Sequence, residues 1–268
     1  MDYHEIFDRL WYDYTVQNPS VKKVHDLLVA EGETVINDHI AFRTFNIPGV
    51  NADVLSQVFI EKGYEFRGQY HFEAKKLNAK HFEHKSDSGA PRVFISELLV
   101  EQFSDYLNSI ARDWVSNIPR DKLLAGELIF SGNVSGIPSI TVYENLRKES
   151  EYAAWLYVYG FRANHFTVSV NGLKKYDSIQ KINEFLKSKG FPLNDAGAEI
   201  QGKPEDLLEQ SSIKAGIINM QFREGSFEIP GCYYEFARRY KDANGKLYSG
   251  FIAKSADKIF ESTNFYQK

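Results

Sequence analysis

The sequence is poor in sulfur-containing residues, with one cysteine, Cys232, and two methionines among 268 residues. A single thiol excludes an internal disulfide framework and is typical of proteins from reducing compartments. No apolar run approaches the roughly 20 residues that a membrane-spanning helix needs. The acidic, amphipathic N-terminus lacks a basic segment followed by an apolar one, so we expect no signal peptide. These absences predict a cytoplasmic protein with no membrane partner.

An excess of charge of one sign is also missing. The chain has 32 lysines and arginines against 36 aspartates and glutamates, a formal net charge of -4. No cluster of basic residues resembles a nucleic-acid footprint, so we expect no nucleic-acid partner. What the chain has in abundance is aromatic residues, at 15% of the total. Large side chains of this kind can build a sizeable core in a globular protein.

Helical and strand-like segments recur in the same order along the chain. Apolar spacing predicts N-terminal helices over 2–16 and 20–31. A strand, a helix and further strands follow at 39–45, 54–62, 64–72, 79–84 and 91–98, and then a long helix from about 96 to 115. Residues 131–140 are rich in Gly, Ser and Pro and indicate a linker. Beyond it, the order strand, helix and strands returns at 164–170, 177–189, 212–224 and 232–240.

Two landmarks suggest that the second half of the chain is a diverged copy of the first. His39 and His165 are 126 residues apart, and the Lys-Gly helix ends at 62–63 and 189–190 are 127 apart. The predicted fold is therefore α+β, with duplicated βαβββ modules that form a curved mixed sheet with helices outside. We expect one domain over 1–268, composed of N-terminal helices (1–33), a first module (34–130) and a second module (140–268).

Side chains on a strand alternate between two faces, and three strands of this chain show a related alternation. One face is largely apolar and suits packing against helices. The other carries a residue that can bind a metal, together with small or polar residues. These faces are His39, Ala41 and Arg43 on the first strand, His165, Thr167 and Ser169 on the second, and Tyr233, Glu235, Ala237 and Arg239 on the third. We expect His39, His165 and Glu235 to converge in a cavity.

Two histidines and one carboxylate are the facial ligand set of non-haem Fe(II) oxygenases, in which three coordination positions stay open for substrate and O2. The same set can bind Zn or Mn. Its residual positive charge would attract a 2-oxo acid. Arg43 suits a substrate carboxylate because its planar guanidinium can bind it through two hydrogen bonds. Arg239 shares the face of Glu235 and is a second candidate for substrate binding.

Other interpretations of these residues stay open. A histidine on a strand is commonly a hydrogen-bonded structural residue, and Arg43 could pair with a core carboxylate such as Glu97. Glu97 also competes with Glu235 as the third ligand, although it could instead cap a helix. Two further functions therefore remain: a Zn- or Mn-dependent hydrolase or lyase acting on a small carboxylate, and a non-enzymatic module that binds small acids.

Five short motifs make the sequence similar to a known family. They are DHIAFRTF (38–45), AKKLNA (74–79), PRVFISEL (91–98), NHFTV (164–168) and YYEFARR (233–239). Together they resemble the 2-oxoadipate dioxygenase/decarboxylase family, over roughly residues 20–240 and in a compact branch. That family is similar in fold to vicinal-oxygen-chelate enzymes.

The resemblance implies a function and a set of site residues. His39, His165 and Glu235 would be iron ligands, and Arg43 would hold the substrate carboxylate. The implied reaction uses O2 to decarboxylate a 2-oxo acid and hydroxylate the same molecule, converting 2-oxoadipate to 2-hydroxyglutarate in lysine breakdown. The expected partners are thus a small 2-oxo acid and O2. The particular 2-oxo acid and the oligomeric state are left open.

Overall fold

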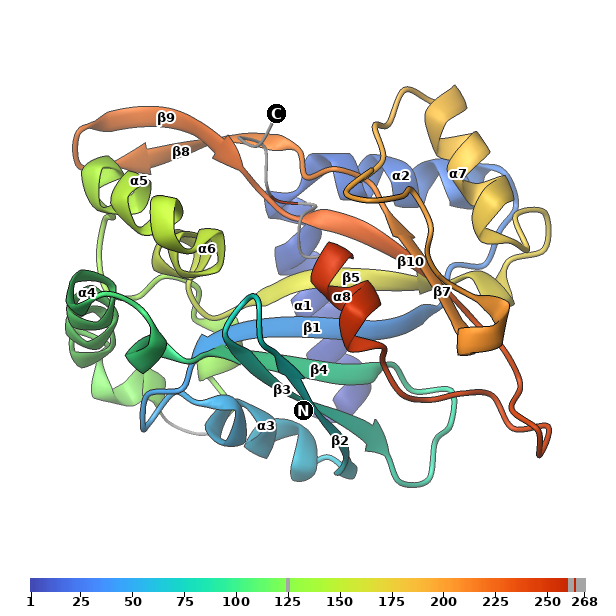
Figure 1. The fold of residues 1–268 in the computed structure, drawn as a ribbon, viewed down its shortest axis with the longest axis horizontal. Coiled ribbons are helices and arrows are strands. Elements are labelled where there is room, and N and C mark those ends of the chain that lie inside the picture. The colour runs from blue at the N-terminus through green and yellow to red at the C-terminus, as the bar shows by residue number, and fades with distance from the viewer. Residues whose placement is uncertain (124–125, 260–262, 264–268) are drawn as a thin grey trace. The chain divides into compact units, whose positions relative to one another are not determined.

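The computed structural model describes residues 1–123, 126–259 and 263 (Figure 1). These residues divide into two compact units that each collect distant parts of the chain. The first unit contains Met1–Tyr14, Ala41–Asn164 and Asn219–Ile229. The second contains Thr15–Ile40, His165–Ile218 and Pro230–Lys268. The predicted division into N-terminal helices and two modules within one domain stays a prediction.

The two N-terminal helices lie where apolar spacing predicts them. Helix α1 covers Tyr3–Gln17 and α2 covers Pro19–Ala30. In α1 the buried side chains are those that share one face, Ile6, Phe7, Leu10 and Tyr14. Pro19 opens α2 at a position where its missing N–H costs no hydrogen bond.

The first unit contains a βαβββ module, as the sequence predicts. Its elements are β1 (Asn37–Phe45, of which residues 41–45 belong here), α3 (Ala52–Ile60), β2 (Tyr64–Phe72), β3 (Leu77–His84) and β4 (Arg92–Leu98). Strands β2, β3 and β4 are antiparallel neighbours, and β1 follows β4 in the sheet order. Asn51 caps α3 by accepting a hydrogen bond from the N–H of Val54.

The prediction of a long helix over about 96–115 is wrong in nearly its first half, because the observed helix begins at Asp105. Strand β4 continues to Leu98, because its residues pair in register with β3. A short 3-10 turn, Val100–Gln102, separates the strand from helix α4 (Asp105–Ser116). Ser104 caps this helix by accepting from the N–H of Leu107, so the helix begins after this serine.

Two helices of the first unit are not among those predicted from the sequence. Helix α5 covers Ile140–Glu149 and α6 covers Glu151–Tyr159, directly after the predicted linker. Every residue of α6 after Glu151 is buried. A helix buried on all sides has no polar face, so it lacks the amphipathic spacing by which helices are predicted.

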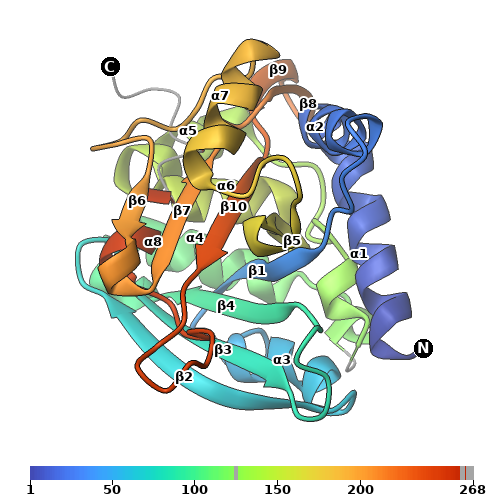
Figure 2. The same ribbon diagram turned by 90° about the vertical axis from the view of Figure 1, so that its right-hand side faces the viewer.

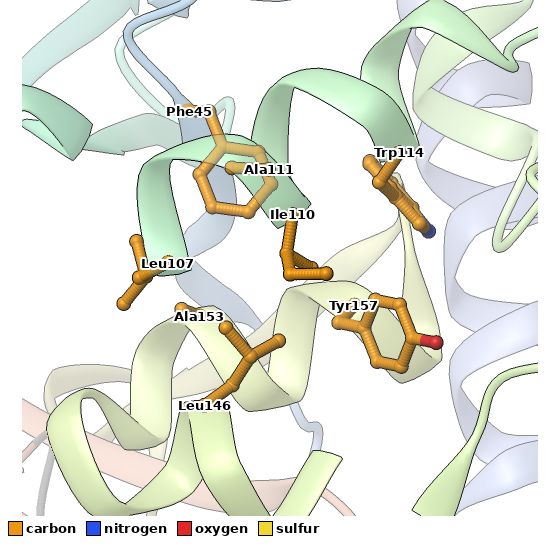
Figure 3. Close-up of a pocket in the computed structure, with 8 residues that line it drawn as sticks. All are labelled: Phe45, Leu107, Ile110, Ala111, Trp114, Leu146, Ala153 and Tyr157. Atoms are coloured by element: carbon orange, nitrogen blue, oxygen red, sulfur yellow. The ribbon is translucent and has the colours of Figure 1, made fainter. Parts of the chain in front are cut away.

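Helices α4, α5 and α6 pack together, and apolar side chains occupy the space between them (Figure 3). No space the size of a water molecule remains between the side chains, so we assign the contact to the core of the first unit and not to a ligand site. The residues are Phe45, Leu107, Ile110, Ala111, Trp114, Leu146, Ala153 and Tyr157.

The second unit repeats the order strand, helix and strands. Its elements include β5 (Ala163–Ser169, of which residues 165–169 belong here), α7 (Ile179–Ser188), β6 (Gln201–Lys203), β7 (Leu208–Ser212), β10 (Tyr233–Arg239) and α8 (Ala253–Ile259). Strand β10 lies between β5, to which it is parallel, and β7, to which it is antiparallel. Strand β6 follows β7, also antiparallel. The sheet is therefore mixed, as predicted.

Helices α7 and α8 both contact the strands of the second unit (Figure 2). Helix α7 packs on β7 and β10, and α8 packs on β6 and β7.

Strands β8 (Ile217–Phe222) and β9 (Gly225–Pro230) form a separate two-stranded sheet. Among the described residues, none of the helices combines the length and apolar character of a membrane-spanning segment.

Helix α7 packs against β10, and Leu186 on the apolar face of this helix is fully buried. We expect Leu186→Ala to lower the free energy of unfolding by about 2–5 kcal/mol, because it removes buried methyl groups and leaves a cavity. Urea denaturation followed by circular dichroism measures this change. Ser188→Ala, at the end of the same helix, is the control and should stay within about 1 kcal/mol. Equal effects of the two substitutions would contradict this packing.

Candidate metal centre

The structure brings together the three side chains that the sequence predicts as ligands. His39 lies on β1, His165 on β5 and Glu235 on β10, all within the second unit. One donor atom from each residue lies within 4.8 Å of the others. Parallel pairing places Tyr233 beside His165 and Glu235 beside Thr167, so the carboxylate is one pleat further along the same face. All three side chains are buried.

The separations of the donor atoms suit a single divalent ion. The two Nε2 atoms of His39 and His165 are 3.4 Å apart. Glu235 places Oε2 3.2 Å from Nε2 of His165 and Oε1 3.7 Å from Nε2 of His39. Donors about 2.1 Å from an ion lie about 3.0 Å apart at right angles and about 3.4 Å apart in a tetrahedron. The donor set and its spacing therefore fit an ion such as Fe(II), Zn or Mn.

The other ring nitrogen of each histidine has a hydrogen-bonding partner that orients the ring. Nδ1 of His39 lies 2.9 Å from Oδ1 of Asp38, and Nδ1 of His165 lies 2.8 Å from the hydroxyl of Tyr233. These partners direct both Nε2 atoms toward Glu235. A partner on the outer nitrogen selects the tautomer whose inner nitrogen can bind a metal. The hydroxyl of Thr167 lies 3.1 Å from Nε2 of His39 and completes the polar lining.

Glu235 is buried without a cation in direct contact among the described residues. Burial, together with the negative charge of Asp38, raises its pKa to about 8, although the hydrogen bond from Gln210 and the charge of Arg239 act in the opposite direction. Nε2 of Gln210 donates to Oε1 of Glu235 at 2.6 Å. A metal ion would supply the positive charge that a buried carboxylate requires.

The pKa of Asp38 is shifted in the opposite direction from that of Glu235. Burial raises the pKa of its carboxyl, but the positive charge of Arg239 and hydrogen bonds from His39 and Arg239 outweigh burial and hold the pKa far below its usual range. Nε of Arg239 donates to Oδ2 of Asp38 at 2.8 Å, and Nη2 donates to Oδ1 at 2.9 Å. Asp38 is therefore ionised, and it accepts a hydrogen bond from Nδ1 of His39.

Arg239 is, from its position on the face of Glu235, a predicted substrate-binding residue. Its guanidinium is buried and contacts Asp38 and the carbonyl oxygens of Tyr248 and Gly250. Whether it also contacts a substrate stays a prediction.

Arg43 belongs to the first unit and is 1% exposed. Its guanidinium carbon lies 4.9 Å from the ring centre of Tyr152 and 5.1 Å from that of Trp155. Nη1 lies 3.5 Å from the carboxylate of Glu151. Two aromatic faces and a carboxylate hold the cation in place.

Glu97, the competing carboxylate, has another role in the structure. Its Oε2 accepts a hydrogen bond from the N–H of Ala52 at 2.9 Å, at the start of α3. It therefore caps a helix that precedes it in the sequence. The metal-capable group found among the described residues is His39, His165 and Glu235.

Sequence reasoning missed the residues around the three candidate ligands. Asp38, Gln210 and Phe251 each contact one of them. Asp38 stands next to His39 in DHIAF, so a carboxylate partner for the imidazole was visible there. Gln210 and Phe251 carry no comparable signal, since their contacts depend on how distant segments pair.

Two βαβββ modules and a buried site of two imidazoles and a carboxylate define a class of protein, an α+β protein with a vicinal-oxygen-chelate-like fold whose site could bind a metal ion. The chain belongs to the 2-oxoadipate dioxygenase/decarboxylase family, whose model matches residues 9–125 and 125–243. A curated relative, the chloroplastic 2-oxoadipate dioxygenase/decarboxylase of Arabidopsis thaliana, is 37% identical over 93% of this chain and 74% of its own length.

Solved structures agree with this family. Hydroxyglutarate synthase of Oryza sativa, crystallised with 2-oxoadipate, has a TM-score of 0.92 and 32% identity over 99% of this chain and 93% of that chain. A hydrolase candidate from Shewanella frigidimarina NCIMB 400 has a TM-score of 0.88 and 48% identity over 94% of this chain and 98% of that chain. A glyoxalase-superfamily protein from Ralstonia eutropha JMP134 shares the fold, with a TM-score of 0.76 and 22% identity over 90% of this chain and 83% of that chain. The predicted fold class is confirmed.

Metal binding should depend on pH through Glu235. The pKa of Glu235 is about 8, so below that pH its carboxyl in the metal-free protein holds a proton that a metal ion must displace. The apparent affinity for Co(II) should therefore rise about fivefold between pH about 7 and about 8, roughly twofold more by pH about 9, and level off above that. Calorimetric titration at several pH values measures this profile. Glu235→Gln has no proton to lose, so it should bind more weakly and with a flatter profile; a flat profile in the parent protein would contradict the assignment.

Proposed function

We propose that this protein is an Fe(II)-dependent dioxygenase that converts 2-oxoadipate and O2 to 2-hydroxyglutarate and CO2. The observation that carries the proposal is the buried cluster of His39, His165 and Glu235, whose donor atoms lie within 4.8 Å of one another. Two neutral imidazoles and one carboxylate are the ligand set of non-haem Fe(II) oxygenases. Membership of the family and the 2-oxoadipate bound to the related rice enzyme support the choice of substrate.

The three side chains would hold the ion and keep one side of it open. When bound, Fe(II) would supply the site at which a 2-oxo acid and O2 meet. The protein contributes orientation, because Asp38 and Tyr233 direct the two imidazoles. It also contributes a dry environment, since each of the three candidate ligands is no more than 3% exposed. Exclusion of water strengthens the attraction between the site and an anionic substrate.

Oxygen consumption tests this proposal directly. The protein is reconstituted with Fe(II) without oxygen, and O2 uptake and CO2 release are then measured against a panel of 2-oxo acids that includes 2-oxoadipate. We expect one O2 consumed per 2-oxo acid, and a loss of activity of at least about 100-fold in His39→Ala, since a facial set with two ligands holds iron poorly. His71→Ala removes an exposed histidine outside the cluster and is the control. Equal activity in the two variants would contradict the proposal.

A metal-dependent hydrolase or lyase is the second candidate, and the Shewanella relative described as a hydrolase candidate favours it. The same three side chains could hold Zn or Mn, with an activated water in an open position. The two functions differ in metal content and in oxygen use. Stoichiometric Zn in the purified protein, with no O2 uptake on any 2-oxo acid after Fe(II) loading, would favour hydrolysis or lysis.

We also propose that Arg43 holds a carboxylate of the substrate. Arg43→Met should raise KM for 2-oxoadipate by roughly 10- to 100-fold, the loss expected when a charged hydrogen bond worth about 1.5–3 kcal/mol is removed. Steady-state oxygen uptake measures KM and kcat. Arg67→Met, which removes an exposed arginine paired with Glu65, is the control. An unchanged KM in Arg43→Met would exclude Arg43 as a substrate contact.

A further inference from the structure

One guanidinium in the second unit joins two parts of the structure. Arg239, 3% exposed, donates from Nε and Nη2 to the carboxylate of Asp38. Its remaining nitrogen, Nη1, donates to the carbonyl oxygen of Gly250 at 2.7 Å and to that of Tyr248 at 3.2 Å. All three nitrogens thus have acceptors, and the acceptors belong to segments far apart in the sequence.

On one side, Arg239 acts on a candidate metal ligand through Asp38. Oδ1 of Asp38 accepts from Nη2 of Arg239 and also lies 2.9 Å from Nδ1 of His39. The guanidinium of Arg239 therefore fixes the carboxylate of Asp38, and this carboxylate in turn orients the imidazole of His39. Without the guanidinium, the Asp38 carboxylate would lose two hydrogen bonds that fix its position, and His39 would be held less firmly.

On the other side, Arg239 holds a short stretch of the chain that we call the strap, residues 248–251. The strap ends in Phe251, whose ring centre lies 4.8 Å from that of His39, edge to face at 88°. The guanidinium carbon of Arg239 lies 5.2 Å from the same ring. Helix α8 begins at Ala253, one residue beyond the strap, and packs on β6 and β7.

Arg239 is therefore connected to His39 in two ways. One connection is the carboxylate of Asp38, and the other is the strap with the ring of Phe251. We propose that Arg239 is a positioning residue that fixes the strap over His39 and, through Asp38, fixes the imidazole for metal binding. The inference rests on the proposed metal site. Under this proposal, the affinity for a metal ion depends on the position of the strap, although the strap contributes no ligand.

The chemistry of arginine explains why this position needs it. A planar fork can bind a carboxylate through two nitrogens and still direct a third at carbonyl oxygens. A lysine ammonium could neutralise Asp38, but it is a single point of charge and could not reach the strap as well. The acceptors in the strap are the backbone carbonyls of Tyr248 and Gly250, so the interaction depends on the side chain of Arg239 and not on that of Tyr248.

The neighbouring residue provides a matched control. Arg238 is next to Arg239 on β10, on the opposite face of the strand, and its guanidinium lies 5.3 Å from the ring of Tyr240. Arg238→Gln and Arg239→Gln remove the same charge from the same strand. Arg239→Lys keeps the charge but removes the fork, so it separates the hold on Asp38 from the hold on the strap.

Two measurements on the full chain test the inference: Co(II) affinity by calorimetry, and hydrogen–deuterium exchange of the strap in metal-free protein. We expect Arg239→Gln to bind Co(II) about 10- to 100-fold more weakly than Arg238→Gln, the usual effect of losing the outer partner of a metal-bound histidine. We also expect its strap to exchange faster. Arg239→Lys should show the faster exchange with a smaller loss of affinity, and it decides the test if Arg239→Gln does not fold by circular dichroism.

Two results would overturn the inference. One is an Arg239 variant that matches Arg238→Gln both in Co(II) affinity and in strap exchange. The other is a rise in KM for 2-oxoadipate with unchanged affinity and exchange, which would make Arg239 a substrate contact instead. Failure of the proposed function is a different result, because parent protein that binds no Co(II) would refute the metal site, while strap exchange would still decide whether Arg239 fixes the strap.

Discussion

Charge balance in a buried site is the constraint on which the second unit depends. Two carboxylates, Asp38 and Glu235, lie close to the same imidazole and are shielded from water. Asp38 has Arg239 as a direct counter-charge and is ionised. Glu235 has no such partner in contact among the described residues, and its pKa rises accordingly. A divalent ion between His39, His165 and Glu235 would provide the missing positive charge.

The duplicated architecture explains how this site is built, and also where the two modules have diverged. Strands β1 and β5 each provide one histidine at corresponding positions. The carboxylates near the ends of the modules have different roles, because Glu97 caps α3 while Glu235 forms a cluster with the two histidines. Four residues after each histidine, the first module has Arg43 and the second has Ser169. One copy therefore contributes a buried cation where the other has a small polar side chain.

The fold by itself does not specify the chemistry. The glyoxalase-superfamily protein of Ralstonia eutropha shares this architecture at 22% identity, and a shared architecture supports many reactions. What distinguishes this chain is the chemistry of one cluster and the hydrogen bonds that orient it. The partners on the outer nitrogens of His39 and His165 differ, a carboxylate for one and a phenol for the other. The two imidazoles are therefore electronically unequal, since a carboxylate makes its histidine the more basic ligand.

The sequence by itself determined what depends on local spacing. Alternation along three strands selected His39, His165 and Glu235, and apolar periodicity located α1, α2 and α7. Periodicity failed where a segment is buried on all sides, as in α6, and where a strand continues into residues that favour a helix, as at the end of β4. In those segments burial and strand pairing outweigh local preference.

Only the tertiary structure decided which side chains meet. Asp38 and Arg239 are 201 residues apart, and their ion pair depends on the order β1, β5 and β10 in the sheet. The same holds for Gln210 beside Glu235 and for Phe251 beside His39. The physical reason is that hydrogen bonds and ion pairs act over a few ångströms in space, whereas sequence patterns report only on neighbours along the chain.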